Sequence, residues 1–367
     1  MAAFGREVSF PDTLISRSCY PNPTAHTGLV ACATYRKAQM KRSLAILSAS
    51  LLLTAGAARA DGVADLPPDQ EPVAAKLAEC HARLLEFRNT RARPATDDKI
   101  LVSWNALAMI AFAEAGRYLG RKDYVEVAVR NARFLLKNLR SEERLLRSWR
   151  AGQAKHNAFL EDYASLTLAL LALYQSDPNP EWYAAALKLA GELVAHFTDP
   201  EGGFFDTRED HEPLPIRPKD LQDNATPCGN SLAAMALLQI AAFGDHPEWR
   251  GLAETTLASL PETALRYPLA FSQWLSAADF AFVPIREVAL VGNPESPALQ
   301  SLQAVLWKTY RPHLVAASSD HPPAPGSPAL LRERPLLDGQ PTAYVCQGFV
   351  CLQPVHSPDD MEEQLLI

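Results

Sequence analysis

Carboxylate, amide and aromatic side chains recur in this chain at the points where apolar helical patterns begin. Carboxylates accept hydrogen bonds from hydroxyl groups and can serve as a general acid and base, while amides and aromatic rings orient a ligand. This set predicts a carbohydrate site, because sugars present hydroxyl groups and ring faces together. The catalytic candidates are Asp98, Glu161 and Asp162. The substrate-binding candidates are Asp97, Trp104, Asn105, Tyr163, Arg217 and Asn230.

Each candidate also has a structural interpretation. Asp97 and Asp98 are good N-cap residues. Glu161 and Asp162 are neighbours about 100° apart on a helix, so one could line a cleft while the other caps the helix or forms a salt bridge. Trp104, Arg217 and Asn230 could likewise either bind a ligand or have a structural role. The residue types alone leave both interpretations open.

The elements that would position these residues are helices with a period of 3.6 residues. Their expected ranges are 73–89, 98–119, 122–140, 159–176, 180–198, 228–244, 247–260, 262–281 and 296–308. Segments 159–176 and 228–244 are apolar nearly all round, whereas 122–140 and 180–198 each have a charged face. Alternation of fully buried and two-faced helices predicts a mainly all-α fold, a partial α/α toroid with inner and outer rings.

Inner helices of such an array run parallel, so their N-termini gather at one end of the ring. Helix N-termini favour anionic and hydrogen-bonding ligands. The connecting segments 145–157 and 199–224 are rich in glycine and charge, and would cover this end or the opposite one. We therefore expect the cleft at the inner-helix N-termini.

Five regions are expected along the chain. They are an unstructured or spurious upstream segment (1–39), a signal-peptide-like segment (40–60), a linker (61–72), the partial toroid (73–310) and a short mixed α/β tail (311–367).

The segment from Met40 has the anatomy of a secretory signal: a basic start, an apolar run from Leu44 to Ala55, and the pattern Ala58-Arg59-Ala60. Translation from Met40 predicts a periplasmic or secreted protein, and an earlier start predicts a cytoplasmic one. The alternative is a chance apolar helix. Because the apolar run is short, no membrane span is expected in the mature chain.

Composition and motifs argue against several functions. The formal net charge is -7 without a long basic run, so nucleic acid is not an expected partner. Walker and dinucleotide glycine patterns are absent from the sequence, so no cofactor is expected. His156 and His196 lack the spacing of a zinc-binding helix, so no metal is expected. Cys228 has no evident base beside it and is not interpreted as a nucleophile.

Cys346 and Cys351 are the two cysteines closest in sequence. Their C-x4-C spacing could form a disulfide, a redox pair or half of a metal site. Alternatively, both are small residues pointing into a strand-rich tail. The last interpretation is favoured, because a zinc site normally needs four ligands and no second pair is evident.

Several motifs, in this order, closely resemble those of the YyaL-like, spermatogenesis-associated protein 20-like family. They are residues 91–105, Leu145–Arg150, Phe159–Ala164, Glu201–Phe205, Pro227–Ser231, Glu287–Gly292 and Ala343–Cys351. The resemblance covers about residues 76–360.

The resemblance implies a helical toroid similar to six-hairpin glycosidases and N-acylglucosamine 2-epimerases, and thus carbohydrate-related chemistry. Members of the family also carry an N-terminal thioredoxin-like domain. That domain and the first helical hairpins are absent from this chain, which looks like the C-terminal half of a family member. In addition, Ala106 stands where the family's Trp-Asn motif continues with glycine.

Three functions compete on these observations. The first is a sugar-directed hydrolase or epimerase-like enzyme. The second is a non-catalytic sugar-binding or assembly module, in which a partner chain could complete the ring. The third, a thiol–disulfide role suggested by the family's name, has the least support because the chain contains no C-x-x-C motif.

Overall fold

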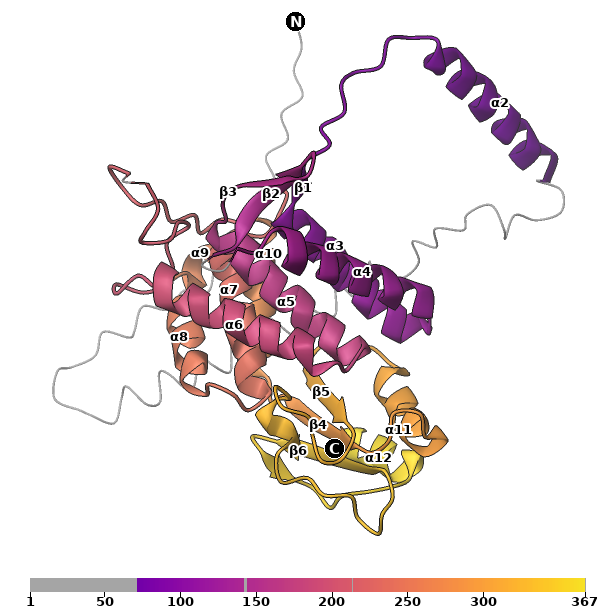
Figure 1. Cartoon of the computed structure of the whole chain (residues 1–367), viewed down its shortest axis with the longest axis vertical. Helices are drawn as coiled ribbons and strands as arrows, with labels where there is room; N and C mark the ends of the chain where they lie inside the picture. The colour runs from indigo at the N-terminus through magenta and orange to yellow at the C-terminus, as the bar shows by residue number, and fades with distance from the viewer. Residues whose placement is uncertain (1–70, 142–143, 213, 367) are drawn as a thin grey trace, which may run out of the picture. The chain divides into compact units, whose positions relative to one another are not determined.

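The computed structural model describes residues 71–141, 144–212 and 214–366 (Figure 1). The expectations for the upstream segment, the signal-like segment and most of the linker lie outside these residues. Contacts divide the chain into Met1–Ala75 and Lys76–Ile367.

The first described helix, α2 (Glu71–Asn89), matches the predicted range 73–89. Its apolar side chains are exposed, for example Leu84 at 66 % and Phe87 at 62 %. Its apolar pattern predicts a helix of the packed array. That assignment is wrong for the structure, because its apolar face is not buried.

Three helix pairs form the array that the sequence predicts. They are α3 (Val102–Leu119) with α4 (Lys122–Asn138), α5 (Leu160–Ser176) with α6 (Pro180–Phe197), and α7 (Gly229–Ala242) with α8 (Glu248–Leu257). Helix α5 contacts both α3 and α7 (Figure 1). It buries 14 of its 17 residues and α7 buries 12 of 14, whereas α4 buries three. Helices α5 and α7 are therefore inner and α4 is outer, as their apolar patterns predict.

Local signals set the ends of these helices. The Asn179 side chain accepts the N–H of Glu181 at 3.0 Å, and Pro180 occupies the first turn of α6. Gly120 ends α3 with a left-handed φ of 64°. None of the helices within the described residues is long and apolar enough to cross a lipid bilayer.

A small antiparallel sheet replaces the irregular connection expected over 145–157. Its strands are β1 (Ile100–Leu101), β2 (Leu146–Arg150) and β3 (Gln153–Asn157). Residues Ala151 and Gly152 turn the β2–β3 hairpin with positive φ values of 50° and 81°. The hairpin brings Arg147 to the N-terminus of α5, where it pairs with Glu161.

The expected helices 262–281 and 296–308 do not form a further pair of the array. The first range breaks into α9 (Pro261–Arg266), a 3-10 turn and α10 (Ser272–Phe282), because Pro268 interrupts it. Helix α10 packs on α7. The second range, α11 (Pro297–Trp307), instead packs on a strand and on α12 in the mixed α/β part.

The α/β part is a four-stranded sheet with two helices. Its elements are β4 (Arg286–Val291), α11, β5 (Leu314–Ser319), β6 (Thr342–Gln347), β7 (Val350–Cys351) and α12 (Pro358–Leu366). The strand order is β5-β4-β6-β7, with β4 and β5 parallel. Parallel neighbours need a crossover, and α11 provides it. The predicted class, a partial α/α toroid with a short mixed α/β tail, is confirmed.

Candidate functional site

The N-termini of α5 and α7 and the segment after α6 enclose a pocket of about 340 Å³. Its lining includes Arg147, Phe159, Glu161, Asp206, Asp220 and Cys228. A second cavity, of about 250 Å³ between α3, α5 and α11, has no carboxylate among its described lining residues. A third, wider cavity of about 1200 Å³ between α4 and α11 also has carboxylates and arginines in its lining, but it lies away from the inner-helix N-termini. The first pocket is the candidate site because its three carboxylates and its arginine lie at those N-termini.

Adjacent carboxylates at the start of α5 have different surroundings. The side chain of Glu161 is 30 % exposed and lies 2.7 Å from Arg147 Nη1 in the pocket wall. The side chain of Asp162 is fully buried. This division, one carboxylate on the cleft and one inside, is the one that the 100° step of the helix predicts.

Asp162 ties three segments together. Its Oδ1 accepts the N–H of Ser103 at 3.1 Å, and its Oδ2 accepts the N–H of Phe159 at 3.0 Å. Arg147 Nη1 donates to the same Oδ2 at 2.9 Å. These bonds join the N-termini of α3 and α5 to the β2–β3 hairpin. Asp162 is therefore a structural anchor, and the catalytic role predicted for it does not fit its position.

Electrostatics favour a charged Arg147 at the pocket wall. Burial opposes its charge, but Asp162 and Glu161 outweigh that effect and raise the pKa of Arg147. Burial also raises the pKa of Asp162, while Arg147 and the backbone N–H donors oppose that rise. The arginine thus links the buried anchor to the carboxylate on the pocket.

Asp206 supplies the second carboxylate of interest. Its Oδ2 accepts the backbone N–H of Asp220 at 2.8 Å. Burial raises the pKa of Asp206, and the negative charges of Asp220 and Glu161 add to the rise. A carboxyl group in this setting keeps its proton to a higher pH than usual, as a general acid must.

Asn230 fastens the segment that carries Asp206 to α7. Its Oδ1 accepts the N–H of Phe204 at 2.8 Å, and its Nδ2 donates to the carbonyl oxygens of Phe204 at 2.9 Å and Asp220 at 3.3 Å. Gly203 has a φ of 73°, and a Cβ there would lie 2.9 Å from Asn230 Oδ1. Asn230 is fully buried, so it holds the segment in place and does not face a ligand.

The candidates that precede α3 lie away from the pocket. Asp98 pairs with Arg150, and Asp97 lies 3.3 Å from Lys99 Nζ, both on an exposed segment. The N-cap interpretation of these aspartates is wrong, because the N-cap of α3 is Leu101. The short strand β1 precedes the helix and moves its start beyond both carboxylates.

Trp104 and Asn105 also lie outside the pocket lining. Trp104 is 62 % exposed, so it belongs neither to the pocket nor to the core. The Asn105 side chain donates to the carbonyl oxygen of Leu101 at 2.9 Å, within the first turn of α3. The expected cleft at the inner-helix N-termini is therefore formed by α5 and α7, and the side chains of Trp104 and Asn105 do not line it.

Tyr163 and Arg217 have structural contacts. The buried Tyr163 hydroxyl accepts the N–H of Leu145 at 2.9 Å and lies 3.3 Å from Arg208 Nη1. The Arg217 guanidinium stacks over Phe205 at 4.0 Å and donates to the carbonyl oxygens of His196 and Thr207. Both side chains order the segments around the pocket without lining it.

Sequence reasoning missed Arg147, Phe159, Asp206 and Asp220 as pocket residues. Arg147 and Phe159 stood inside motifs already noted, but their side chains enter the pocket only because a hairpin folds onto α5. Asp206 and Asp220 lie in a segment without periodicity, and they meet through a backbone hydrogen bond. Within the described ranges, no three His, Cys, Asp or Glu side chains are arranged to hold a metal ion.

Cys228 is expected to resist alkylation in the folded protein. Burial raises the pKa of its thiol to about 11, although hydrogen bonds with Ser231 oppose the rise. At neutral pH, iodoacetamide should label Cys228 on the order of 100-fold more slowly than an ordinary exposed thiol. Peptide mapping can compare it with the exposed Cys80. Equal rates at Cys228 and Cys80 in folded protein would contradict this expectation.

Comparisons with known proteins agree with the motifs noted in the sequence. No protein-family model matches the chain. Human spermatogenesis-associated protein 20 is 29 % identical over 315 residues, which is 81 % of this chain and 40 % of that protein. Its mouse counterpart is 29 % identical over 313 residues, or 80 % of this chain and 39 % of that protein. The chain thus spans about two fifths of the length of these relatives.

Solved structures of two carbohydrate-active enzymes overlap with part of the chain. Unsaturated glucuronyl hydrolase from Bacillus sp. GL1 has a TM-score of 0.37 and 18 % identity, covering 46 % of this chain and 49 % of that one. Cellobiose 2-epimerase from Spirochaeta thermophila has a TM-score of 0.37 and 18 % identity, covering 53 % and 56 %. The sequence matches, over four fifths of the chain, show that this protein is similar to spermatogenesis-associated protein 20.

Proposed function

We propose that the pocket at the N-termini of α5 and α7 binds a carbohydrate and that Glu161 and Asp206 act on it as base and acid. The observation that carries the proposal is a pair of carboxylates on one pocket in unlike environments. Glu161 is ion-paired with Arg147, whereas burial raises the pKa of Asp206. Carboxyl groups separated in this way can divide the roles of base and acid.

The pocket lining suits a polyhydroxylated ligand. The carboxylates of Glu161, Asp206 and Asp220 can accept hydrogen bonds from sugar hydroxyls. Phe159 adds an apolar wall, and the Arg147 guanidinium lies 4.7 Å from the centre of its ring. The volume of about 340 Å³ accommodates a small ligand.

The acid and base roles are assigned from the surroundings of each group: burial raises the pKa of Asp206, and Glu161 lies 2.7 Å from Arg147 Nη1. In a hydrolysis, protonated Asp206 would donate to the departing glycosidic oxygen and ionised Glu161 would take a proton from water. In an epimerisation, the same pair would remove and return a proton at a sugar carbon. Both reactions need one group protonated and one ionised at the same pH.

Substitution of Glu161 or Asp206 with its amide is expected to lower turnover of a responsive sugar by about 100-fold or more, because an amide can neither donate nor take up the proton. A panel of free, N-acetylated and glycosidically linked sugars would first be screened by thermal unfolding. A sugar that binds the folded protein should raise the unfolding temperature. Turnover of that sugar would then be measured in Glu161→Gln, Asp206→Asn and the control Glu209→Gln, which is exposed and outside the pocket lining.

The pH dependence of the free energy of unfolding shows whether Asp206→Asn loses turnover through the loss of a proton donor or through unfolding. The folded protein holds the Asp206 proton more tightly than the unfolded chain, because burial raises the pKa above 3.8. This contribution to stability is complete below pH 3.8 and is lost as the pH rises through the folded-state pKa. Asp206→Asn should therefore fold as stably as the wild type or more stably at neutral pH. A sugar that stabilises all variants without turnover would favour the alternative, a non-catalytic sugar-binding module. No response to any sugar would refute both.

A further inference from the structure

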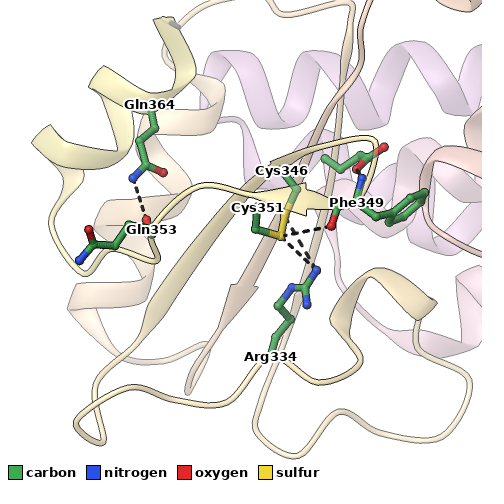
Figure 2. Close-up of a disulfide and its surroundings, with 7 residues drawn as sticks. Arg334, Cys346, Phe349, Cys351, Gln353 and Gln364 are labelled. Carbon is green, nitrogen blue, oxygen red and sulfur yellow. Dashed lines mark hydrogen bonds between the residues drawn. A yellow bond between two sulfur atoms is a disulfide. The ribbon is translucent and has the colours of Figure 1, made fainter.

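Two cysteines that the proposed function does not use lie on β6 and β7, at one edge of the sheet in the α/β part (Figure 2). Cys346 and Cys351 are cross-strand partners in β6 and β7 and form a disulfide. The favoured interpretation of these residues as two unlinked small side chains is therefore wrong, and the disulfide alternative holds. The turn between them places Gly348 and Phe349 at positive φ values of 58° and 62°, which returns the chain after two residues.

An arginine points at the two sulfurs (Figure 2). Arg334 Nη2 lies 3.1 Å from Cys351 Sγ and 3.9 Å from Cys346 Sγ. The guanidinium also lies over the ring of Tyr344 at 5.4 Å, and its buried Nε has no hydrogen-bond partner among the described residues. A neutral disulfide gains little from a cation at this distance. A thiolate gains a great deal, because a nearby cation stabilises its charge.

The two sulfurs differ in accessibility. Cys346 is 1 % exposed, whereas Cys351 is partly exposed. Cys351 belongs to the edge strand β7, so its partly exposed side chain is the one that an incoming thiol can reach. Attack on Cys351 would leave Cys346 as the departing sulfur.

A buried carboxyl group holds the turn in place. Glu287 lies opposite Cys346 in the β4–β6 register, so Glu287, Cys346 and Cys351 form one row across three strands. Glu287 Oε2 accepts the N–H of Phe349 at 2.7 Å. The positive charges of Arg334 and, from α8, Arg250 act on Glu287, and Arg286 of β4 donates to the Gln347 side chain at 2.7 Å. The Glu287 hydrogen bond and the pairing of β4, β6 and β7 thus support the turn in addition to the bond between the sulfurs.

We propose that Cys346–Cys351 is a thiol–disulfide exchange site for low-molecular-weight thiols, in which Cys351 is attacked and Arg334 stabilises the thiolates that form. An external thiolate RS⁻ attacks Cys351 Sγ; the new S–S bond forms as the Cys346–Cys351 bond breaks, and Cys346 leaves as a thiolate. A second RS⁻ attacks the R sulfur of the mixed disulfide, which releases RSSR and the Cys351 thiolate. Two thiols are oxidised, the protein disulfide takes up two electrons, and the two protons lost by the thiols end on Cys346 and Cys351.

The first test uses single cysteine variants of the full chain with oxidised glutathione as the probe. Cys346→Ser retains the accessible Cys351 and should form a mixed disulfide that peptide mass spectrometry locates. Cys351→Ser retains only the buried Cys346 and should react at least about tenfold more slowly, because access limits exchange. Equal rates in the two variants would overturn the assignment of Cys351 as the attacked sulfur.

The second test distinguishes stabilisation of the Cys351 thiolate by Arg334 from a purely structural role of this arginine. In the Cys346→Ser background, Arg334→Gln should slow mixed-disulfide formation about tenfold at neutral pH and move the midpoint of its pH profile upward, while Arg334→Lys should restore part of the rate. The matched control is Arg332→Gln, two residues away, whose side chain is 71 % exposed and pairs with Asp245. Identical pH midpoints in Arg334→Gln and Arg332→Gln would refute the role of Arg334. A native disulfide that glutathione reduces only as fast as the chain unfolds would refute the exchange site itself.

Discussion

Replacing Asp162 with alanine is expected to lower the free energy of unfolding by about 3–5 kcal/mol, because it removes one partner of a buried ion pair. The carboxylate is fully buried and accepts hydrogen bonds from Ser103, Phe159 and Arg147. Its loss leaves two backbone N–H groups without partners at the start of α3 and α5. It also leaves a partly buried guanidinium with only Glu161 to balance it.

Urea unfolding of Asp162→Ala and Glu161→Ala tests this expectation with a matched pair. Both residues bind Arg147, but the side chain of Glu161 is 30 % exposed and contributes within about 1 kcal/mol, as solvent-exposed ion pairs do. Asp162→Asn is informative as a third variant, because its amide oxygen can keep one of the backbone bonds. Equal losses of stability for the two alanine variants would show that Asp162 is not the anchor.

Replacing Asn230 with alanine is expected to cost about 2–4 kcal/mol and to abolish sugar binding at the pocket. The side chain satisfies both backbone polar groups of Phe204, and a buried group left without its partner costs about 1–3 kcal/mol. The third bond, to the carbonyl oxygen of Asp220, links Asn230 to a pocket residue. Without it, Asp206 and Asp220 lose their fixed distance from Glu161.

Asn224→Ala is the control for this variant. Asn224 is exposed, and its side chain accepts one local N–H, from Ala225 at 2.9 Å. Chemical unfolding should separate the two variants by at least about 1.5 kcal/mol, the difference between a buried amide and an exposed one. Stabilisation by a responsive sugar should persist in Asn224→Ala and disappear in Asn230→Ala. Sugar stabilisation that survives in Asn230→Ala would mean that the pocket does not depend on this clamp.

Several residues that the sequence predicted as site residues have structural roles instead. Asp162, Tyr163 and Asn230 all hold elements together at the end of the ring where the pocket lies. Their polar side-chain atoms form hydrogen bonds with backbone N–H groups and carbonyl oxygens, and so are not free to bind a ligand. The carboxylates that line the pocket are Glu161, which was predicted, and Asp206 and Asp220, which were not.

Local signals in the amino-acid sequence predicted the three helix pairs of the array, but not the exposure of α2 or the place of α11. Apolar periodicity predicted α5 over 159–176, and the helix spans Leu160–Ser176. The range expected for α6, 180–198, begins at Pro180, and the helix spans Pro180–Phe197. Such signals are local, because a period, a cap or a proline acts within one or two turns. The order of buried and two-faced helices then predicted which helices are inner.

Tertiary structure alone decided which polar side chains face the pocket. Asp97 and Asp98 looked like caps or catalysts, but a two-residue strand placed them on an exposed segment. Asp206 had no sequence signal and enters the site because Asn230, 24 residues later, binds the backbone beside it. The helical pattern of 296–308 was predicted, but its place beside parallel strands was not. The apolar periodicity of a segment indicates which of its faces is buried. Contacts between segments distant in sequence depend instead on which backbone groups remain unpaired once the helices have packed.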